Sequence, residues 1–248
     1  MPKNIDVVYI LKKNTDPQEL IYSLRSLKNF PHRKVWFVGG QPDGLYPDGR
    51  IKHEQTGVTK WERVRSSLIK ITECDEITDD FYIFNDDFFV MKPQSGEFVN
   101  LTDGTLEMKI KTINRKYIQS NYAHQLERLR AVLLFEGVDS MSFALHVPFK
   151  VNKAKTRELL KEHNTPMFRS LYGNIYNERY IYHKDVKIND VVTEPDKEAD
   201  YLSTNANSFV NGKAGEYIRA QFTEPCAYEL TPTERIRRDT AELYEGCE

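Results

Sequence analysis

The sequence predicts an α/β fold in which a mostly parallel sheet is flanked by helices and is followed by an irregular C-terminal half. Short apolar runs at residues 5–11, 34–38 and 81–84 alternate with segments of helical periodicity over about the first 90 residues. Both intervening helices also begin with a sequence signal for a helix N-terminus. This order is typical of a parallel sheet, whose ligands bind beyond the carboxyl ends of the strands.

The first predicted strand covers residues 5–11, and a polar loop separates it from the first helix. That helix opens at Asp16–Glu19, where Asp16 is expected to accept a hydrogen bond from the Glu19 amide. Glu19 in turn completes a capping box, and leucines at helical spacing give the helix a core-facing side. Pro31 ends the segment.

The second predicted strand covers residues 34–38 and ends at Gly39-Gly40, where glycines permit a tight turn or the close approach of a ligand. Thr59–Glu62 is a second capping box. It opens a helix whose apolar face carries Val64, Leu68 and Ile71. The third strand, residues 81–84, follows this helix.

The second half of the chain has a less regular pattern. Residues 120–134 and 152–162 are predicted helices, and residues 143–148 are a short apolar run between them. From residue 164 onward, we expect the aromatic and Asn-rich stretches at residues 170–174 and 203–210 to form loops that pack on the sheet, and from residue 231 a peripheral charged tail. Because we find no internal repeat and no low-complexity linker, we expect the whole chain to be a single domain.

The composition is that of an ordinary globular protein, with 248 residues, 29% charged and 40% hydrophobic. The chain contains no run of about 18 apolar residues and no signal-peptide core, so neither a membrane span nor secretion is expected. Three widely spaced cysteines without a CxxC pair predict a reducing compartment, no disulfide framework and no zinc site. GxGxxG, Walker, GxSxG and HExxH motifs are absent, which counts against dinucleotide-binding enzymes, P-loop kinases and the common hydrolases.

A local excess of basic residues lies in residues 109–130, where only Glu127 is acidic. The net charge of −2 argues against a protein built wholly around nucleic acid. The segment is therefore either a solvated surface or a contact for phosphate, nucleic acid or an acidic partner. Its basic residues are Lys109, Lys111, Arg115, Lys116, Arg128 and Arg130.

Adjacent acids interrupt the most apolar part of the sequence. Asn85, Asp86 and Asp87 stand between the strand at residues 81–84 and a second apolar run. Neighbouring carboxylates repel and are costly to desolvate without a compensating cation. Mg²⁺ and Mn²⁺ are held by one or two carboxylates together with substrate phosphates, so this strand end is predicted to present acids to a metal-bound, phosphate-bearing substrate. The alternative is a pair of acids that cap a helix or form salt bridges.

Several segments, taken in order, resemble a known family. The Asn-Asp-Asp region resembles the Asp-x-Asp region of GT-A nucleotide-sugar glycosyltransferases, and the chain is more closely similar to the Stealth sugar-phosphate transferases. The resemblance covers roughly the first 150 residues and implies a GT-A-like (Rossmann-like) fold. Its segments are Ile5–Tyr9, Asp16-Pro17, Glu19–Leu27, Val35–Pro42, Phe84–Asp87 and His146–Pro148.

The chain departs from the Stealth pattern after its first strand, where Ile10–Thr15 replaces a Trp-Val-Asp-Gly turn. Arg169–Asn174 and Pro225–Glu229 resemble segments of bacteriophage glycosyltransferases. The resemblance thus implies a cytoplasmic enzyme, in the host cytoplasm if it is encoded by a phage. It also implies a nucleotide-sugar-binding half over residues 1–110 and an acceptor-side half over residues 111–230.

In this interpretation Mn²⁺ or Mg²⁺ bridges the donor phosphates. If residues 85–87 continue the strand, Asn85 and Asp87 share one face and form the metal-ligand pair, while Asp86 faces away and holds sugar hydroxyls. The resemblance points to His146 as a further metal ligand, although a buried histidine bonded to backbone would also fit. His183 is a weaker candidate.

The remaining roles concern the acceptor base and the donor contacts. Glu136 and Asp139 are candidates for the base of an inverting enzyme, or else plain loop acids. Arg25, Lys60 and Arg63 are candidates for binding donor phosphates, although the latter two would also fit a solvated helix face. Tyr9, near the end of the first strand, either stacks on the nucleotide base or belongs to the core.

The sequence therefore predicts a metal-dependent glycosyltransferase that moves a sugar from a nucleotide-sugar to a glycan, a protein or a modified nucleobase. One rival is a Stealth-like enzyme that transfers sugar-1-phosphate and releases a nucleoside monophosphate. The other is a non-catalytic protein that binds nucleic acid or an acidic partner through residues 109–130.

Overall fold

The structure is a computed structural model that describes residues 4–116, 120–164, 166–176, 179–231 and 233–234. Most of the predicted tail, residues 231–248, thus lies outside the described residues. Across the described part of the chain, no helix has the length and apolar character that a bilayer crossing requires.

A five-stranded sheet forms the centre of the molecule, in the order β3-β2-β1-β4-β7. The first four strands in this order are parallel, and β7 runs antiparallel to β4. The prediction of an α/β fold with a mostly parallel sheet is therefore confirmed. The strand bounds are β1 Asp6–Leu11, β2 Val35–Gly39, β3 Gly49–Ile51, β4 Asp80–Phe84 and β7 Phe149–Asn152.

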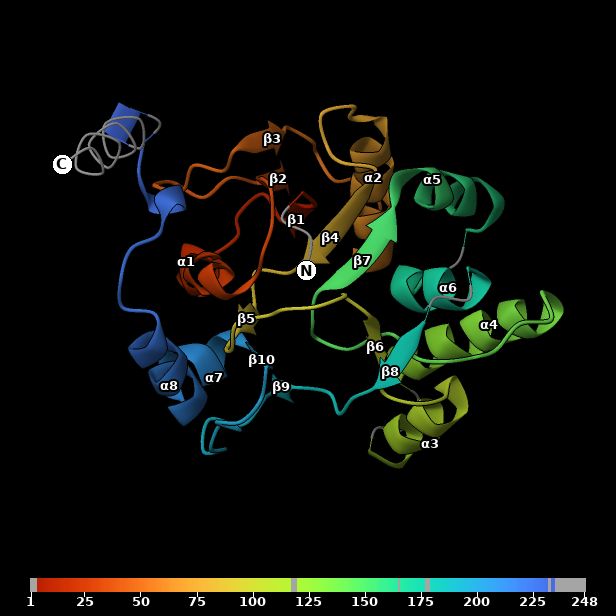
Figure 1. The fold of residues 1–248 in the computed structure, drawn as a ribbon. Coiled ribbons are helices and arrows are strands. Elements are labelled where there is room, and N and C mark those ends of the chain that lie inside the picture. Colours follow the sequence, from red (N-terminus) through yellow and green to blue (C-terminus); the bar gives the residue numbers. More distant parts are fainter. Residues whose placement is uncertain (1–3, 117–119, 165, 177–178, 232, 235–248) are drawn as a thin grey trace.

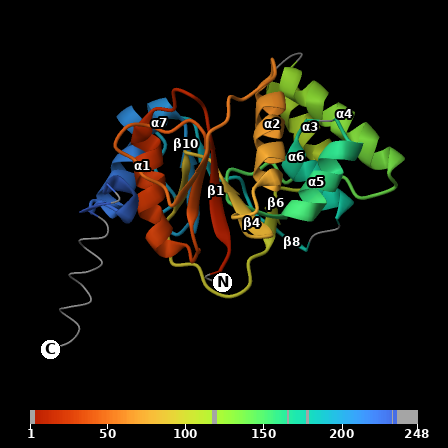
Figure 2. The same cartoon turned by 90° about the horizontal axis from the view of Figure 1, so that it is seen from above.

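Helices cover both faces of this sheet (Figures 1 and 2). On one face lies α1 (Pro17–Ser26), and on the other lie α2 (Lys60–Glu73) and α5 (Lys153–Glu162). Successive side chains of a strand point to opposite faces, so Val7 packs with the leucines of α1 while Val8 packs with the apolar face of α2. Two hydrophobic cores thus lie on the two sides of the sheet.

The helix N-termini confirm one capping box and correct the other. Thr59 and Glu62 exchange the hydrogen bonds of a capping box at the start of α2, as predicted. At α1, however, Asp16 accepts from the Gln18 amide, and the Glu19 side chain accepts instead from the hydroxyl of Thr204. Glu19 therefore forms a tertiary hydrogen bond with Thr204 in place of the predicted hydrogen bond within its own helix N-terminus.

Residues 88–102 and 180–204 contribute two small sheets. One has the order β5-β10-β9, with β5 at Phe88–Val90, β10 at Tyr201–Thr204 and β9 at Lys187–Ile188. The other pairs β6 (Asn100–Thr102) with β8 (Tyr180–Tyr182). Because β10 pairs with β5 directly after the acidic segment, residues far apart in sequence meet at that point.

The second half is more regular than predicted. Its other helices are α3 (Leu106–Lys116), α4 (Asn121–Phe135), α6 (Phe168–Ile175), α7 (Ala206–Asn211) and α8 (Lys213–Gln221), and η1 (Leu27–Asn29) and η2 (Ala227–Glu229) are single 3₁₀ turns. The prediction of loops from residue 164 onward is wrong for α6, β10 and α7. Tertiary contacts hold α6: Ser170 accepts from the Phe143 amide, and the Asn174 side chain bonds both backbone groups of Met141. Such contacts override weak local propensity.

Gly39 and Gly40 mark a close approach of two backbone segments. Gly39 has a φ of +98°, and a Cβ there would lie 2.4 Å from the Leu11 carbonyl oxygen. A Cβ on Gly40 would lie 2.0 Å from the Lys12 carbonyl oxygen. The glycines are therefore required by the loop after β1, and their contact is with the protein's own backbone.

Candidate active site

The acidic segment forms a turn at the carboxyl edge of the main sheet, which we define as the edge where β1, β2 and β4 end. β4 ends at Phe84, and the Phe88 amide donates to the Asn85 carbonyl at 3.3 Å. Residues 85–87 are therefore not an extended strand, and the prediction that Asn85 and Asp87 share a strand face is wrong. Asn85 is exposed, whereas Asp86 and Asp87 are partly buried.

Asp87 is the most constrained of these acids. Its Oδ2 forms an ion pair with Lys187 of β9, and the same ammonium donates to the Thr204 carbonyl at the end of β10. Its other oxygen, Oδ1, is buried and has no hydrogen-bond partner among the described residues. A buried carboxylate oxygen without a donor is costly, so Oδ1 marks a position where a cation or a hydrogen-bond donor would be stabilising.

Glu19 joins the two aspartates to form an acidic cluster, defined as Glu19, Asp86 and Asp87. Thr204 links Glu19 to Lys187, the partner of Asp87. The Thr204 hydroxyl donates to Glu19 Oε1 at 2.8 Å, and its carbonyl accepts from Lys187. Burial, together with the charges of Asp87 and Asp86, raises the pKa of Glu19 to about 7. Burial and the charge of Asp87 likewise raise the pKa of Asp86. The cluster thus holds more negative charge than Lys187 alone compensates.

Replacing Glu19 with glutamine should stabilise the protein at alkaline pH. Because the pKa of Glu19 is raised from 4.5 to about 7, the folded protein retains a proton that the unfolded chain releases, so stability falls as pH rises through this range. Glu19→Gln removes that loss and can keep the Thr204 hydrogen bond. After allowance for partial exposure we expect a gain of about 1–2 kcal/mol at pH 8.

Thermal unfolding of the wild type and Glu19→Gln at pH 8 and pH 4.5 measures this gain. The difference between the two proteins should be large at pH 8 and nearly absent at pH 4.5. An equal difference at both pH values would show that Glu19 does not carry the proton.

A second polar group lies next to the acidic cluster and consists of His146 and Asp185. The His146 Nδ1 lies 3.1 Å from both carboxylate oxygens of Asp185, and the His146 amide donates to Oδ1 at 3.2 Å. Burial alone would raise the pKa of Asp185, but these hydrogen bonds and the charge of His146 lower it to about 2. A hydrogen bond from Nδ1 leaves Nε2 without a partner among the described residues, which is how metal-binding histidines are commonly oriented.

Phe88 connects the two groups because it directly follows Asp87 and faces His146. The rings of Phe88 and His146 lie edge to face with centroids 6.4 Å apart. The guanidinium of Arg169, from α6, lies over the Phe88 ring at 5.2 Å. Its charge interacts with both Asp87 and Asp185. Glu19, Lys187, Asp185 and Thr204 were not candidates from sequence, and Arg169 appeared only within a family resemblance.

Tyr9 does not have the position that base stacking requires. The residue is fully buried, its hydroxyl hydrogen-bonds with Ser23, and its ring packs against Phe37 and Phe84. A ring that stacks on a nucleotide base must be accessible from solvent. Tyr9 is therefore a core residue.

Arg25 also lies away from the acidic cluster. It follows Glu19 by six residues, or about 9 Å along the axis of α1, toward the opposite edge of the sheet. Its guanidinium pairs with Glu229 at 2.6 Å and donates to the carbonyls of Phe222 and Thr223. Its role in this structure is to hold the C-terminal segment against α1, and the prediction that it binds donor phosphates does not fit.

The two candidate bases lie directly after α4, which ends at Phe135. Glu136 and Asp139 are both exposed, and Glu136 lies 3.9 Å from His163. This position, beside the end of α5, separates them from the acidic cluster. They therefore fit the alternative of plain loop acids.

Three other candidates remain at the surface. Lys60 lies over the ring of Trp61, and Arg63 donates to the carbonyls of Gly57 and Val58, so both have local contacts at the start of α2. His183 is partly exposed, and its Nδ1 interacts with the Lys184 carbonyl.

Part of the basic segment at residues 109–130 is neutralised. Lys109 forms an ion pair with Asp103, and Lys111 pairs with Glu107 on the same helix. Both acids precede the segment, which is why its own composition did not reveal them. Fewer charges are therefore available for nucleic acid than the sequence suggested.

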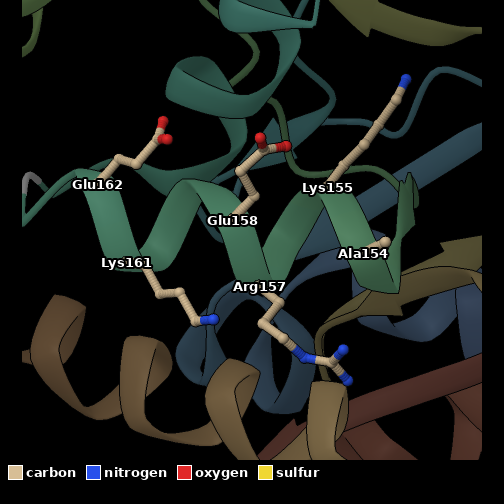
Figure 3. Close-up of a pocket in the computed structure, with 6 residues that line it drawn as sticks. All are labelled: Ala154, Lys155, Arg157, Glu158, Lys161 and Glu162. Carbon is tan, nitrogen blue, oxygen red and sulfur yellow. The ribbon is translucent and has the colours of Figure 1, made fainter.

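A shallow pocket lies on α5 (Figure 3). Lys155, Glu158 and Glu162 extend from one side of the helix, and Arg157 and Lys161 extend from the other, where Arg157 donates to the Thr72 carbonyl of α2. A mixed-charge helix face of this kind is typical of a solvated surface. The pocket is lined by Ala154, Lys155, Arg157, Glu158, Lys161 and Glu162.

The chemistry of the carboxyl edge fits a divalent cation held mainly by its substrate. Within the described ranges, no group of three or more His, Cys, Asp or Glu side chains is arranged to hold a metal ion. Mg²⁺ and Mn²⁺, however, commonly use one or two carboxylates and complete their coordination with phosphates and water. The buried Oδ1 of Asp87 lacks a hydrogen-bond partner among the described residues and lies at this edge, so Asp87 is the first candidate ligand.

No known protein family matches this sequence, and a search of curated proteins finds no match. The assignment of function therefore depends on the chemistry of the carboxyl edge.

Proposed function

We propose that this protein is a metal-dependent glycosyltransferase that uses a nucleotide-sugar donor. The observation that carries the proposal is the buried, unpartnered Oδ1 of Asp87 at the carboxyl edge of a mostly parallel sheet. Ligands of such sheets bind at this edge, and a carboxylate oxygen without a donor there favours a bound cation. The proposed GT-A-like character of the fold rests on the same strand order and on the sequence resemblance.

Asp87 would hold the metal, with Asp86, Asn85 or His146 as a second ligand. The metal, when bound, supplies a Lewis acid that stabilises charge on the departing nucleoside diphosphate. Asp185 supports the assignment of His146 because it fixes the ring through Nδ1. Asp86, beside Asp87 on the turn, remains the candidate for binding the sugar hydroxyls.

Glu19 is the carboxyl group best suited to accept the acceptor proton. A general base works best when its pKa lies near the working pH, and the pKa of Glu19 is raised to about 7. It also lies within the acidic cluster, whereas Glu136 and Asp139 do not. We therefore propose Glu19 in place of the two bases expected from sequence.

Product analysis separates this function from its nearest rival. Incubation with nucleotide-sugars and Mn²⁺, followed by separation of the released nucleotides, should yield a nucleoside diphosphate. Release of a nucleoside monophosphate would instead support the Stealth-like transfer of sugar-1-phosphate. Release of neither, together with binding that weakens steeply with salt, would favour the non-catalytic nucleic-acid or acidic-partner binder.

A further inference from the structure

Arg169 is a largely enclosed cation whose own contacts leave part of it unused. Its Nη1 donates to the carbonyls of Leu145 at 3.0 Å and Val147 at 2.7 Å. Its Nε and Nη2 make no hydrogen bond to any described residue. The guanidinium is also held between aromatic rings, with its Cζ 5.2 Å from the centre of Phe88 and 5.7 Å from that of Phe149. The group is thus fixed in place, while the N–H donors on Nε and Nη2, three of its five, remain available.

The acids near Arg169 are already engaged elsewhere. Asp87 pairs with Lys187, and Asp185 pairs with His146, so neither forms an ion pair with Arg169 in the described part of the structure. Enclosed arginines usually have a carboxylate partner, because an uncompensated charge is costly away from water. Arg169 therefore resembles a binding group without its ligand more than a structural ion pair.

We propose that Arg169 binds a phosphate group of the ligand through Nε and Nη2. A guanidinium presents two parallel donors that match two oxygens of a phosphate, and one already held in place loses little conformational entropy on binding. The location indicates which phosphate this is, because Arg169 lies over the ring of Phe88, the residue that follows Asp87, and its charge interacts with Asp87. If Asp87 holds the metal of the proposed transferase, Arg169 contacts the diphosphate of the donor and compensates its charge as it departs. This assignment of the phosphate rests on the proposed function.

Titration calorimetry with inorganic pyrophosphate in EDTA tests the site without a metal and without a choice of nucleotide. Wild type should bind pyrophosphate, Arg169→Met should bind at least tenfold more weakly, and Arg169→Lys should fall between them because it keeps the charge but loses the planar pair of donors. Arg157→Met is the matched control, since Arg157 also donates to a backbone carbonyl but lies on α5. It should bind pyrophosphate like the wild type.

Further measurements distinguish a folding defect of the Arg169 variants from a specific loss of pyrophosphate binding. If Arg169→Met does not fold, because the carbonyls of Leu145 and Val147 lose their donor, Arg169→Lys at an unchanged melting temperature still has to show the weaker binding. Equal pyrophosphate affinity in a folded Arg169 variant and the wild type, or no binding by the wild type, would overturn the proposal. Arg169-dependent pyrophosphate binding without any nucleotide-sugar turnover would support the proposed phosphate site at Arg169 and contradict the proposed transferase function.

Discussion

Asp87→Ala is expected to abolish metal-dependent nucleotide binding and any sugar transfer, and also to destabilise the fold. The first effect follows because the variant lacks the carboxylate proposed to hold the metal, which contributes several kcal/mol to charge stabilisation. The second follows because Lys187, whose side chain is only 15% exposed, loses its partner. Removing one member of a largely buried ion pair costs about 3 kcal/mol. Calorimetric binding and thermal unfolding measure the two effects separately.

The double variant Asp87→Ala/Lys187→Met tells these effects apart. Removing both charges leaves no unpaired ammonium, so much of the lost stability should return. Metal-dependent nucleotide binding should stay absent, because the carboxylate is still missing. Recovery of nucleotide binding in the double variant would mean that Asp87 serves only to neutralise Lys187.

Asp6→Ala should cause the largest loss of stability of any substitution considered. Asp6 is fully buried at the start of β1, and its carboxylate accepts two bonds from Arg33 at 2.7 Å, one from the Trp36 indole at 3.0 Å and one from the Thr78 amide at 3.2 Å. The variant leaves the indole and the amide without an acceptor and the guanidinium without a counter-ion. We expect a loss of about 3–5 kcal/mol in the free energy of unfolding.

Denaturant unfolding of Asp6→Ala beside a surface control measures this loss. Glu73→Ala removes an exposed carboxylate that pairs with Lys70 on the same helix, with side chains about half exposed. Such pairs contribute less than about 1 kcal/mol, so the control should unfold nearly like the wild type. A similar small loss for both variants would show that the Asp6 network contributes little.

The sequence predicted the framework because its signals are local. The strands β1, β2 and β4 and the helices α1 and α2 follow from apolar runs and helical spacing, and the Thr59 cap depends on residues three apart. Where a tertiary contact competes with a local one, the local prediction failed. Glu19 does not form its predicted capping box, because its side chain accepts a hydrogen bond from Thr204, a residue 185 positions away in sequence. In the same way α6 forms through contacts with Met141 and Phe143 that no short pattern reveals.

Within the candidate site, the sequence indicated Asp86, Asp87 and His146 but not the residues that pair with them. Adjacent acids inside an apolar run identified Asp87, because such charges need compensation. The compensating Lys187 is 100 residues away in sequence and reaches Asp87 only because β9 and β10 pair beside β5. Arg25 was a candidate because its charge suits a phosphate and because it lies in a segment that resembles the family, but in the structure it pairs with Glu229 of the C-terminal segment.

The most direct test of the account is the thermal stability of the wild type and the double variant Asp87→Ala/Lys187→Met against a panel of nucleoside diphosphates and nucleotide-sugars, with and without Mn²⁺. A ligand present at about 100 times its Kd should stabilise the folded protein by about 2.7 kcal/mol, which gives a clear rise in melting temperature. We predict that one nucleotide stabilises the wild type only with Mn²⁺ and has no effect on the double variant. Absence of a shift with every nucleotide, or an equal shift in both proteins, would contradict a donor site at Asp87.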